Sequence, residues 1–130
     1  MKYFIEVLKN YATFTGRARR KEYWMFILFY YLIMIILALP ILFYINNEEA
    51  FYDYEGAFYW PLIIYIIATF LPWLAVSVRR LHDTGKSGLF FLIRGVPVVG
   101  RIIFLVWTCE KGEVGENQYG PDPKSEDETY

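Results

Sequence analysis

The sequence has few of the side chains that build disulfides and metal centres. Cys109 is the only cysteine among 130 residues, so no disulfide can form within one chain. His82 is the only histidine, which excludes a metal site built from several histidines. We therefore expect no metal and no cofactor, and we interpret Cys109 as a small apolar residue near a membrane boundary.

Charge is absent from two long stretches. Residues 24–45 and 57–78 each run for 22 positions without Asp, Glu, Lys or Arg. A helix of that length measures about 33 Å and can cross a hydrocarbon core of roughly 30 Å. The composition agrees, with 56% hydrophobic residues against about 45–50% in soluble domains. Both stretches are predicted membrane spans, and the predicted fold class is an all-α, polytopic membrane bundle.

A third apolar segment, residues 87–109, contains two charges. Arg94 and Arg101 lie seven positions apart, on one face of a straight helix. We prefer a kinked third span, in which the two arginines reach towards opposite interfaces, bind an anionic lipid or meet a partner subunit. The alternative is an element broken at residues 95–97, with both ends on one side of the membrane.

The sign of the charge alternates along the chain. Residues 1–23 hold six bases and two acids, residues 46–56 hold four acids and no base, and residues 79–88 hold three bases and one acid. Because Lys and Arg accumulate in cytoplasmic segments, the N-terminus and residues 79–88 are predicted cytoplasmic, and residues 46–56 external. Three full spans would place the acidic C-terminal segment outside, whereas a broken third element would return it to the cytoplasm.

Apolar residues recur every three or four positions ahead of the first span. They are Tyr3, Phe4, Val7, Leu8, Tyr11 and Phe14. This spacing predicts an N-terminal amphipathic helix, which either lies on the membrane surface or packs against the bundle.

Two basic segments, residues 15–24 and 79–88, are the candidate binding sites. Each Lys or Arg near an anionic leaflet contributes on the order of 1 kcal/mol to binding. The predicted contacts for anionic lipid or a partner protein are Arg17, Arg19, Arg20, Arg79, Arg80 and Lys86. The alternative is that these cations only orient the chain, with Gly85 capping a helix. Nucleic-acid binding is not expected, because the cations lie at the bilayer.

Catalytic side chains are not evident. His82 and Asp83 could form an acid–base pair, but adjacent side chains on a helix point about 100° apart. We therefore predict a non-enzymatic membrane component. The alternative function is a subunit of an oligomeric transporter or channel, with Arg94 and Arg101 attracting an anion. The predicted partners are membrane lipids, and either a membrane protein or further copies of the chain.

The C-terminal part is rich in glycine and proline. Residues 112–123 are predicted to form an ordered cap on one end of the bundle, and residues 124–130 are polar and predicted disordered. Residues 1–123 then form a single membrane domain.

Three motifs, taken in order, resemble one bacterial family. Residues 10–24 (NYATFTGRARRKEYW), 79–88 (RRLHDTGKSG) and 115–123 (GENQYGPDP) are similar to motifs of the domain-of-unknown-function 805 family. The resemblance implies a multi-pass protein of the bacterial inner membrane, and it brings no catalytic residue and no defined biochemical role. The chain departs from the family's usually uncharged third segment at Arg94 and Arg101.

Overall fold

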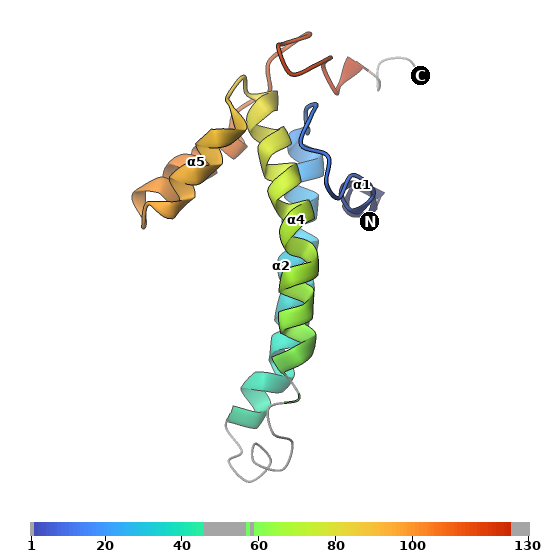
Figure 1. Cartoon of the computed structure of the whole chain (residues 1–130), viewed down its shortest axis with the longest axis vertical. Helices are drawn as coiled ribbons and strands as arrows, with labels where there is room; N and C mark the ends of the chain where they lie inside the picture. Colours follow the sequence, from blue (N-terminus) through green and yellow to red (C-terminus); the bar gives the residue numbers. More distant parts are fainter. Residues whose placement is uncertain (1, 46–56, 58, 126–130) are drawn as a thin grey trace.

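The computed structural model describes residues 2–45, 57 and 59–125 (Figure 1). These residues form helices connected by turns, and no β-strand is present in the part of the chain that is described. The predicted all-α fold is therefore confirmed. The elements are α1 (Lys2–Lys9), α2 (Arg20–Ile45), α4 (Tyr59–Asp83), the 3-10 helix η1 (Gly88–Gly95) and α5 (Val99–Cys109).

The two longest helices, α2 and α4, lie side by side along the long axis of the molecule (Figure 1). The Tyr30 and Tyr65 rings stack between them with centroids 5.6 Å apart, and the Tyr65 hydroxyl donates to the Tyr30 carbonyl at 3.1 Å. The predicted external loop, residues 46–56, connects the two helices and lies outside the described residues.

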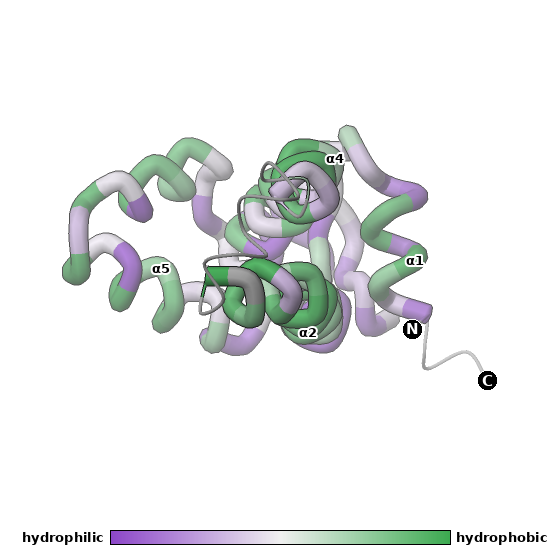
Figure 2. The backbone as a smooth tube through the Cα atoms, turned by 90° about the horizontal axis from the view of Figure 1, so that it is seen from below, coloured by the Kyte–Doolittle hydropathy of each residue, from purple (hydrophilic) through white to green (hydrophobic). Residues whose placement is uncertain are grey.

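The outer surface of this helix pair is apolar. Residues Arg20–Phe43 and Tyr59–Asp83 are both long and apolar enough to cross a membrane. Their hydrophobic side chains are exposed rather than packed: Leu28 is 58% exposed, Ile64 62% and Ile67 70%. Figure 2 shows hydrophobic colouring along α2. A soluble protein rarely leaves such a continuous apolar surface uncovered, whereas lipid chains cover it without cost.

The third apolar segment is broken, whereas the preferred prediction is one kinked span over residues 87–109. The segment forms η1, a turn and then α5, whose 11 residues measure only about 16 Å. The chain reverses at Pro97 and Val98. Val98 has φ 61° and ψ −70°, and the Val99 N–H donates to the Pro97 carbonyl at 2.7 Å, which is a tight γ-turn.

Both ends of this η1–α5 hairpin lie at the same end of the molecule. The hairpin leaves the C-terminal end of α4 and returns to it (Figure 1). Gly100, which is buried, makes the reversal possible, because a Cβ there would collide with the Ile93 carbonyl and the Val96 side chain. The break matches the alternative expectation of a broken element, and the placement of both its ends on one side of the membrane stays a prediction.

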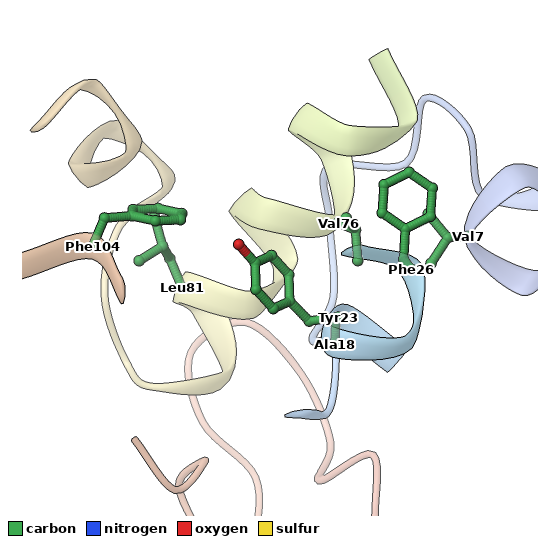
Figure 3. Packing of buried hydrophobic residues seen from close by; sticks show 7 residues of the cluster. All are labelled: Val7, Ala18, Tyr23, Phe26, Val76, Leu81 and Phe104. Atoms are coloured by element: carbon green, nitrogen blue, oxygen red, sulfur yellow. The ribbon is translucent and has the colours of Figure 1, made fainter. Parts of the chain in front are cut away.

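A small core at this end holds α1, α2, α4 and α5 together. In Figure 3, Val7 of α1 lies beside Phe26 of α2, and Phe104 of α5 lies near Leu81 of α4. The Phe4 ring also stacks on Phe26 with centroids 5.4 Å apart. The predicted amphipathic helix is thus present and packs against the bundle, but it ends at Lys9.

Candidate functional site

The centre of the site is the carboxylate of Asp83, at the end of α4. Its Oδ1 atom lies 3.0 Å from Nη2 of Arg17 and accepts a hydrogen bond from Nε of Arg17 at 3.1 Å. Its Oδ2 atom pairs with Arg80, one turn earlier on the same helix. All three side chains are at most 2% exposed. One buried negative charge therefore faces two buried positive charges.

Backbone carbonyls of the C-terminal segment accept the remaining guanidinium protons. Arg80 donates from Nε to the Thr108 carbonyl at 3.1 Å, and Arg17 donates to the carbonyls of Glu113 and Gly115. Carbonyl dipoles can stabilise a cation that has no carboxylate of its own. The extra positive charge thereby fixes residues 108–115 onto the end of the bundle.

The backbone permits this close approach at Gly112. Gly112 is buried, and a Cβ at this position would overlap the Asp83 carboxylate. The next N–H, of Glu113, donates to the Asp83 backbone carbonyl at 2.8 Å. The predicted ordered cap is therefore confirmed for this part of the chain, while residues 126–130 of the predicted disordered segment lie outside the described residues.

Gly85 ends α4 as predicted. It has φ 72°, a conformation that favours glycine. The Gly85 N–H donates to the His82 carbonyl at 3.1 Å, and the Lys86 N–H donates to the Leu81 carbonyl at 2.9 Å. These two bonds form a Schellman C-cap, which turns the chain towards the hairpin.

A second ion pair joins α2 to α4. Arg79 Nη1 lies 2.9 Å from the carboxylate of Glu22, and the two side chains are 7% and 13% exposed. The Arg79 backbone carbonyl accepts from the Ala18 N–H at 3.0 Å. Nε and Nη2 of Arg79 are buried without a hydrogen-bond partner. Glu22 therefore carries most of the compensation for this buried cation.

Among the described residues, the contacts of His82 are with loop residues and not with a carboxylate. Its ring stacks on Tyr119 with centroids 3.9 Å apart, and its Nδ1 lies 3.2 Å from the Gly16 carbonyl. Asn117 donates to the His82 carbonyl at 3.0 Å. His82 thus points away from Asp83, so the two do not form an acid–base pair. Within residues 2–45, 57 and 59–125, no three His, Cys, Asp or Glu side chains are grouped to hold a metal ion.

The six predicted contact cations divide into two groups. Arg17, Arg79 and Arg80 are buried in the ion pairs described above, so their side chains contact other parts of the protein. Their charge is compensated inside the protein. The other three lie nearer the surface.

Those three differ in what they contact. Arg19 donates to the Pro123 carbonyl at 2.5 Å, and Lys86 pairs with Glu110 at 2.5 Å. Arg20, at the start of α2, is exposed. Arg20 is therefore the member of the set best placed to meet lipid or another protein.

Arg94 and Arg101 are brought together by the hairpin. The Arg94 guanidinium carbon lies 4.8 Å from the centroid of Trp73 and 4.7 Å from that of Phe104. Arg101 is exposed and lines the same pocket, of about 220 Å³, between the hairpin and α2. The two arginines therefore line one pocket from separate helices, η1 and α5, and not from one face of a straight helix as predicted.

The sequence analysis does not identify the carboxylates that pair with these arginines. It considers Asp83 only beside His82 and assigns no role to Glu22. A signal was present, because Glu22 is the only acid in residues 15–24 and Asp83 the only acid in residues 79–88. A lone acid inside a basic segment at a membrane boundary is a candidate for an internal ion pair. The carbonyl acceptors depend on the fold and have no such signal.

Arg17, Asp83 and Gly115 show that the three motifs meet in one place. The family described as "Protein of unknown function (DUF805)" matches residues 11–121, which include Arg17, Asp83 and Gly115. The chain belongs to this family. It is 44% identical over 126 residues to "Inner membrane protein YhaH" of Escherichia coli strain K12, covering 97% of this chain and 99% of that protein.

A second relative gives the same description. The chain is 44% identical over 124 residues to "Inner membrane protein YhaI" of Escherichia coli strain K12, covering 95% of this chain and 97% of that protein. No solved structure matches the chain. Family membership, these relatives and the two membrane-length helices make this chain an integral membrane protein. Neither the family description nor the relatives' names indicate catalysis.

Proposed function

We propose that this chain is a non-enzymatic component of the bacterial inner membrane whose basic end lies on the cytoplasmic leaflet and binds anionic lipid there. One observation carries the proposal. The exposed cations at the start of α2, Arg20 and Lys21, lie at the end of the bundle that also carries α1. The orientation follows from the accumulation of Lys and Arg at this end.

Helix α1 adds an apolar contact to this basic surface. Phe4 and Val7 pack into the bundle, whereas Ile5 is 46% exposed and Leu8 39% exposed. Lys2 and Lys9, at the two ends of the helix, are exposed as well. Exposed apolar residues between cations are typical of a helix that rests in the interfacial region of an anionic leaflet.

The buried ion pairs support this function indirectly. Because Arg17, Arg79 and Arg80 are compensated internally, they hold the loop that precedes α2 against α4. The exposed cations Arg20 and Lys21 therefore emerge from a fixed framework and not from a free chain. A fixed group of cations loses less conformational entropy when it binds than a mobile one does.

The test compares binding of anionic and zwitterionic lipid by the purified, reconstituted chain. Quenching of tryptophan fluorescence by brominated phosphatidylglycerol and phosphatidylcholine gives the relative affinity. Replacing both Arg20 and Lys21 with Gln should lower the preference for phosphatidylglycerol by about 2 kcal/mol, or roughly 30-fold, at low salt. Added salt should weaken the wild-type preference, because exposed charges are screened.

The control variant is Lys111→Gln, which removes an exposed cation from the C-terminal segment. It should change the lipid preference less than the double variant does. An unchanged preference after loss of Arg20 and Lys21 would contradict lipid binding by this surface, and the partner-protein interpretation would then be the one to pursue.

A further inference from the structure

The pocket between the hairpin and α2 contains two arginines without a compensating acid. Its lining includes Arg94 and Arg101 but no carboxylate, and neither arginine forms an ion pair or hydrogen bond with any residue that the structure describes. An arginine beside apolar groups that exclude water is usually paired with an acid, a carbonyl or a ligand. Two such cations in one pocket of about 220 Å³ favour an anion between them.

Arg94 is held in a defined orientation. Its guanidinium carbon lies over the rings of Trp73 at 4.8 Å, Phe104 at 4.7 Å and Phe91 at 5.8 Å. These cation–π contacts do not use the guanidinium N–H groups as hydrogen-bond donors to an oxygen, so donors remain for a ligand. Those donors match the geometry of a phosphate, which accepts two parallel hydrogen bonds from one arginine. The aromatic rings thereby preorganise the Arg94 side chain for binding a phosphate.

The cationic pocket continues into an apolar groove along α2. Trp24, Ile27 and Tyr31 line both the pocket and a second groove of about 340 Å³. The rest of that groove is lined by Leu28, Leu32 and Ile35, all on the same side of the helix. From residue 24 to residue 35 it follows about 16 Å of helix.

We infer that this combined site binds one anionic phospholipid, with its phosphate between Arg94 and Arg101 and an acyl chain along the α2 groove. Charge selects against a neutral lipid, which would leave a cation uncompensated. The apolar groove selects against free phosphate, which would leave that groove unfilled. This site is separate from the exposed basic surface at Arg20 and Lys21.

The experiment measures thermal unfolding of the full chain in a nonionic detergent with added ligand. Short-chain phosphatidylglycerol, short-chain phosphatidylcholine and inorganic phosphate are the three probes. A ligand that binds only the folded state raises the unfolding temperature, and at a fixed ligand concentration the rise increases with the logarithm of the affinity. We expect phosphatidylglycerol to raise it, and the other two probes to have little effect.

Variants then locate the binding site. Arg101→Gln should fold, because Arg101 is exposed and has no ion pair or hydrogen bond among the described residues, and it should weaken phosphatidylglycerol binding at least about tenfold. Arg94→Gln should do the same. Leu28→Trp, at a position 58% exposed, should block the groove and weaken binding without removing a charge. Lys111→Gln is the matched charge control and should bind like the wild type.

Four results would overturn the inference. Equal stabilisation by phosphatidylcholine would remove the role of charge, and equal stabilisation by inorganic phosphate would identify a free-anion site instead. Unchanged binding in Arg101→Gln would show that the lipid binds elsewhere. If the loss appeared only on replacing Arg20 and Lys21, the proposed basic surface would stand and this pocket would not.

Discussion

The Arg17 guanidinium lies 3.0 Å from the Asp83 carboxylate, although the two residues are 66 positions apart in the chain. Arg17 precedes the first membrane-length helix, and Asp83 ends the second. The same Asp83 carboxylate also pairs with Arg80. This shared carboxylate fixes the N-terminal loop, α4 and the C-terminal segment at one end of the bundle.

Asp83→Asn should destabilise the folded chain more than any exposed substitution. It keeps the shape of the side chain but leaves Arg17 and Arg80 buried without a carboxylate. Removing one partner of a buried ion pair costs about 3–5 kcal/mol. The unfolding temperature in detergent should fall, and trypsin should cut faster after Lys111 as the C-terminal segment loosens. Glu116→Gln, an exposed acid in the same segment, is the control. Equal stability of the two variants would refute the role assigned to Asp83.

The Glu22–Arg79 pair should show energetic coupling in a double-mutant cycle. The two groups are 2.9 Å apart and mostly buried, so each single replacement with Gln leaves one charge uncompensated. The double replacement removes both charges and should be less harmful than the sum of the singles. We expect a coupling free energy of about 1–3 kcal/mol from unfolding measurements. Simple additivity would mean that the pair does not connect α2 to α4.

The tight turn of the hairpin predicts that substitutions at two nearby positions change the stability of the hairpin in opposite directions. Val98 adopts φ 61°, which is strained for a β-branched residue, and its side chain is 68% exposed. Val98→Gly should therefore stabilise the hairpin, by about 1 kcal/mol. Gly100→Ala should destabilise it, because the new methyl group meets the Ile93 carbonyl.

Gly95→Ala is the control for this pair of variants, since a Cβ at Gly95 meets nothing within 4 Å. Its unfolding temperature in detergent should stay close to that of the wild type. If Gly100→Ala behaved like Gly95→Ala, the close reversal between η1 and α5 would be incorrect.

Asp122 should stabilise the C-terminal segment in a pH-dependent way. Hydrogen bonds from the backbone N–H groups of Lys124 and Gly115 keep the pKa of its carboxyl below the usual value. A lowered pKa in the folded state means that the stabilisation is complete above the unfolded pKa, about 3.9. It is lost as the pH falls through the lower, folded value.

The amide chemical shifts of Gly115 and Lys124 report this titration directly by NMR. In the wild type they should move together, with a midpoint below about 3.9. In Asp122→Asn the transition should be missing, because the amide side chain does not titrate in this range. A wild-type midpoint above that of an exposed aspartate would contradict the hydrogen bonds.

The sequence predicts the parts of the fold that depend on local composition. The uncharged stretches identify α2 and α4, the three- and four-residue spacing identifies α1, and Gly85 identifies the end of α4. Each of these features depends on residues within one helix or turn. Such features are visible without knowing what lies beside them.

The third segment and the ion pairs are different, because they depend on distant neighbours. Length and apolarity favour one span over residues 87–109. In the structure, the turn at Val98 and the close approach of Gly100 to Ile93 divide this segment into two helices. From the sequence, Arg17 and Arg80 are predicted to be surface cations. In the structure, α4 and the C-terminal segment provide hydrogen-bond acceptors for both. Only the three-dimensional arrangement distinguishes a compensated arginine from a free one.

The central claim is that the η1–α5 hairpin does not cross the membrane, so the C-terminal segment lies on the same side as the start of α2. In a Cys109→Ser background, single cysteines at Lys21, Asp53 and Lys124 are treated in cells with a membrane-impermeant thiol reagent. We predict labelling of Asp53→Cys in intact cells, and labelling of Lys21→Cys and Lys124→Cys only after the inner membrane is permeabilised. Labelling of Lys124→Cys together with Asp53→Cys in intact cells would show a third full span and contradict the claim.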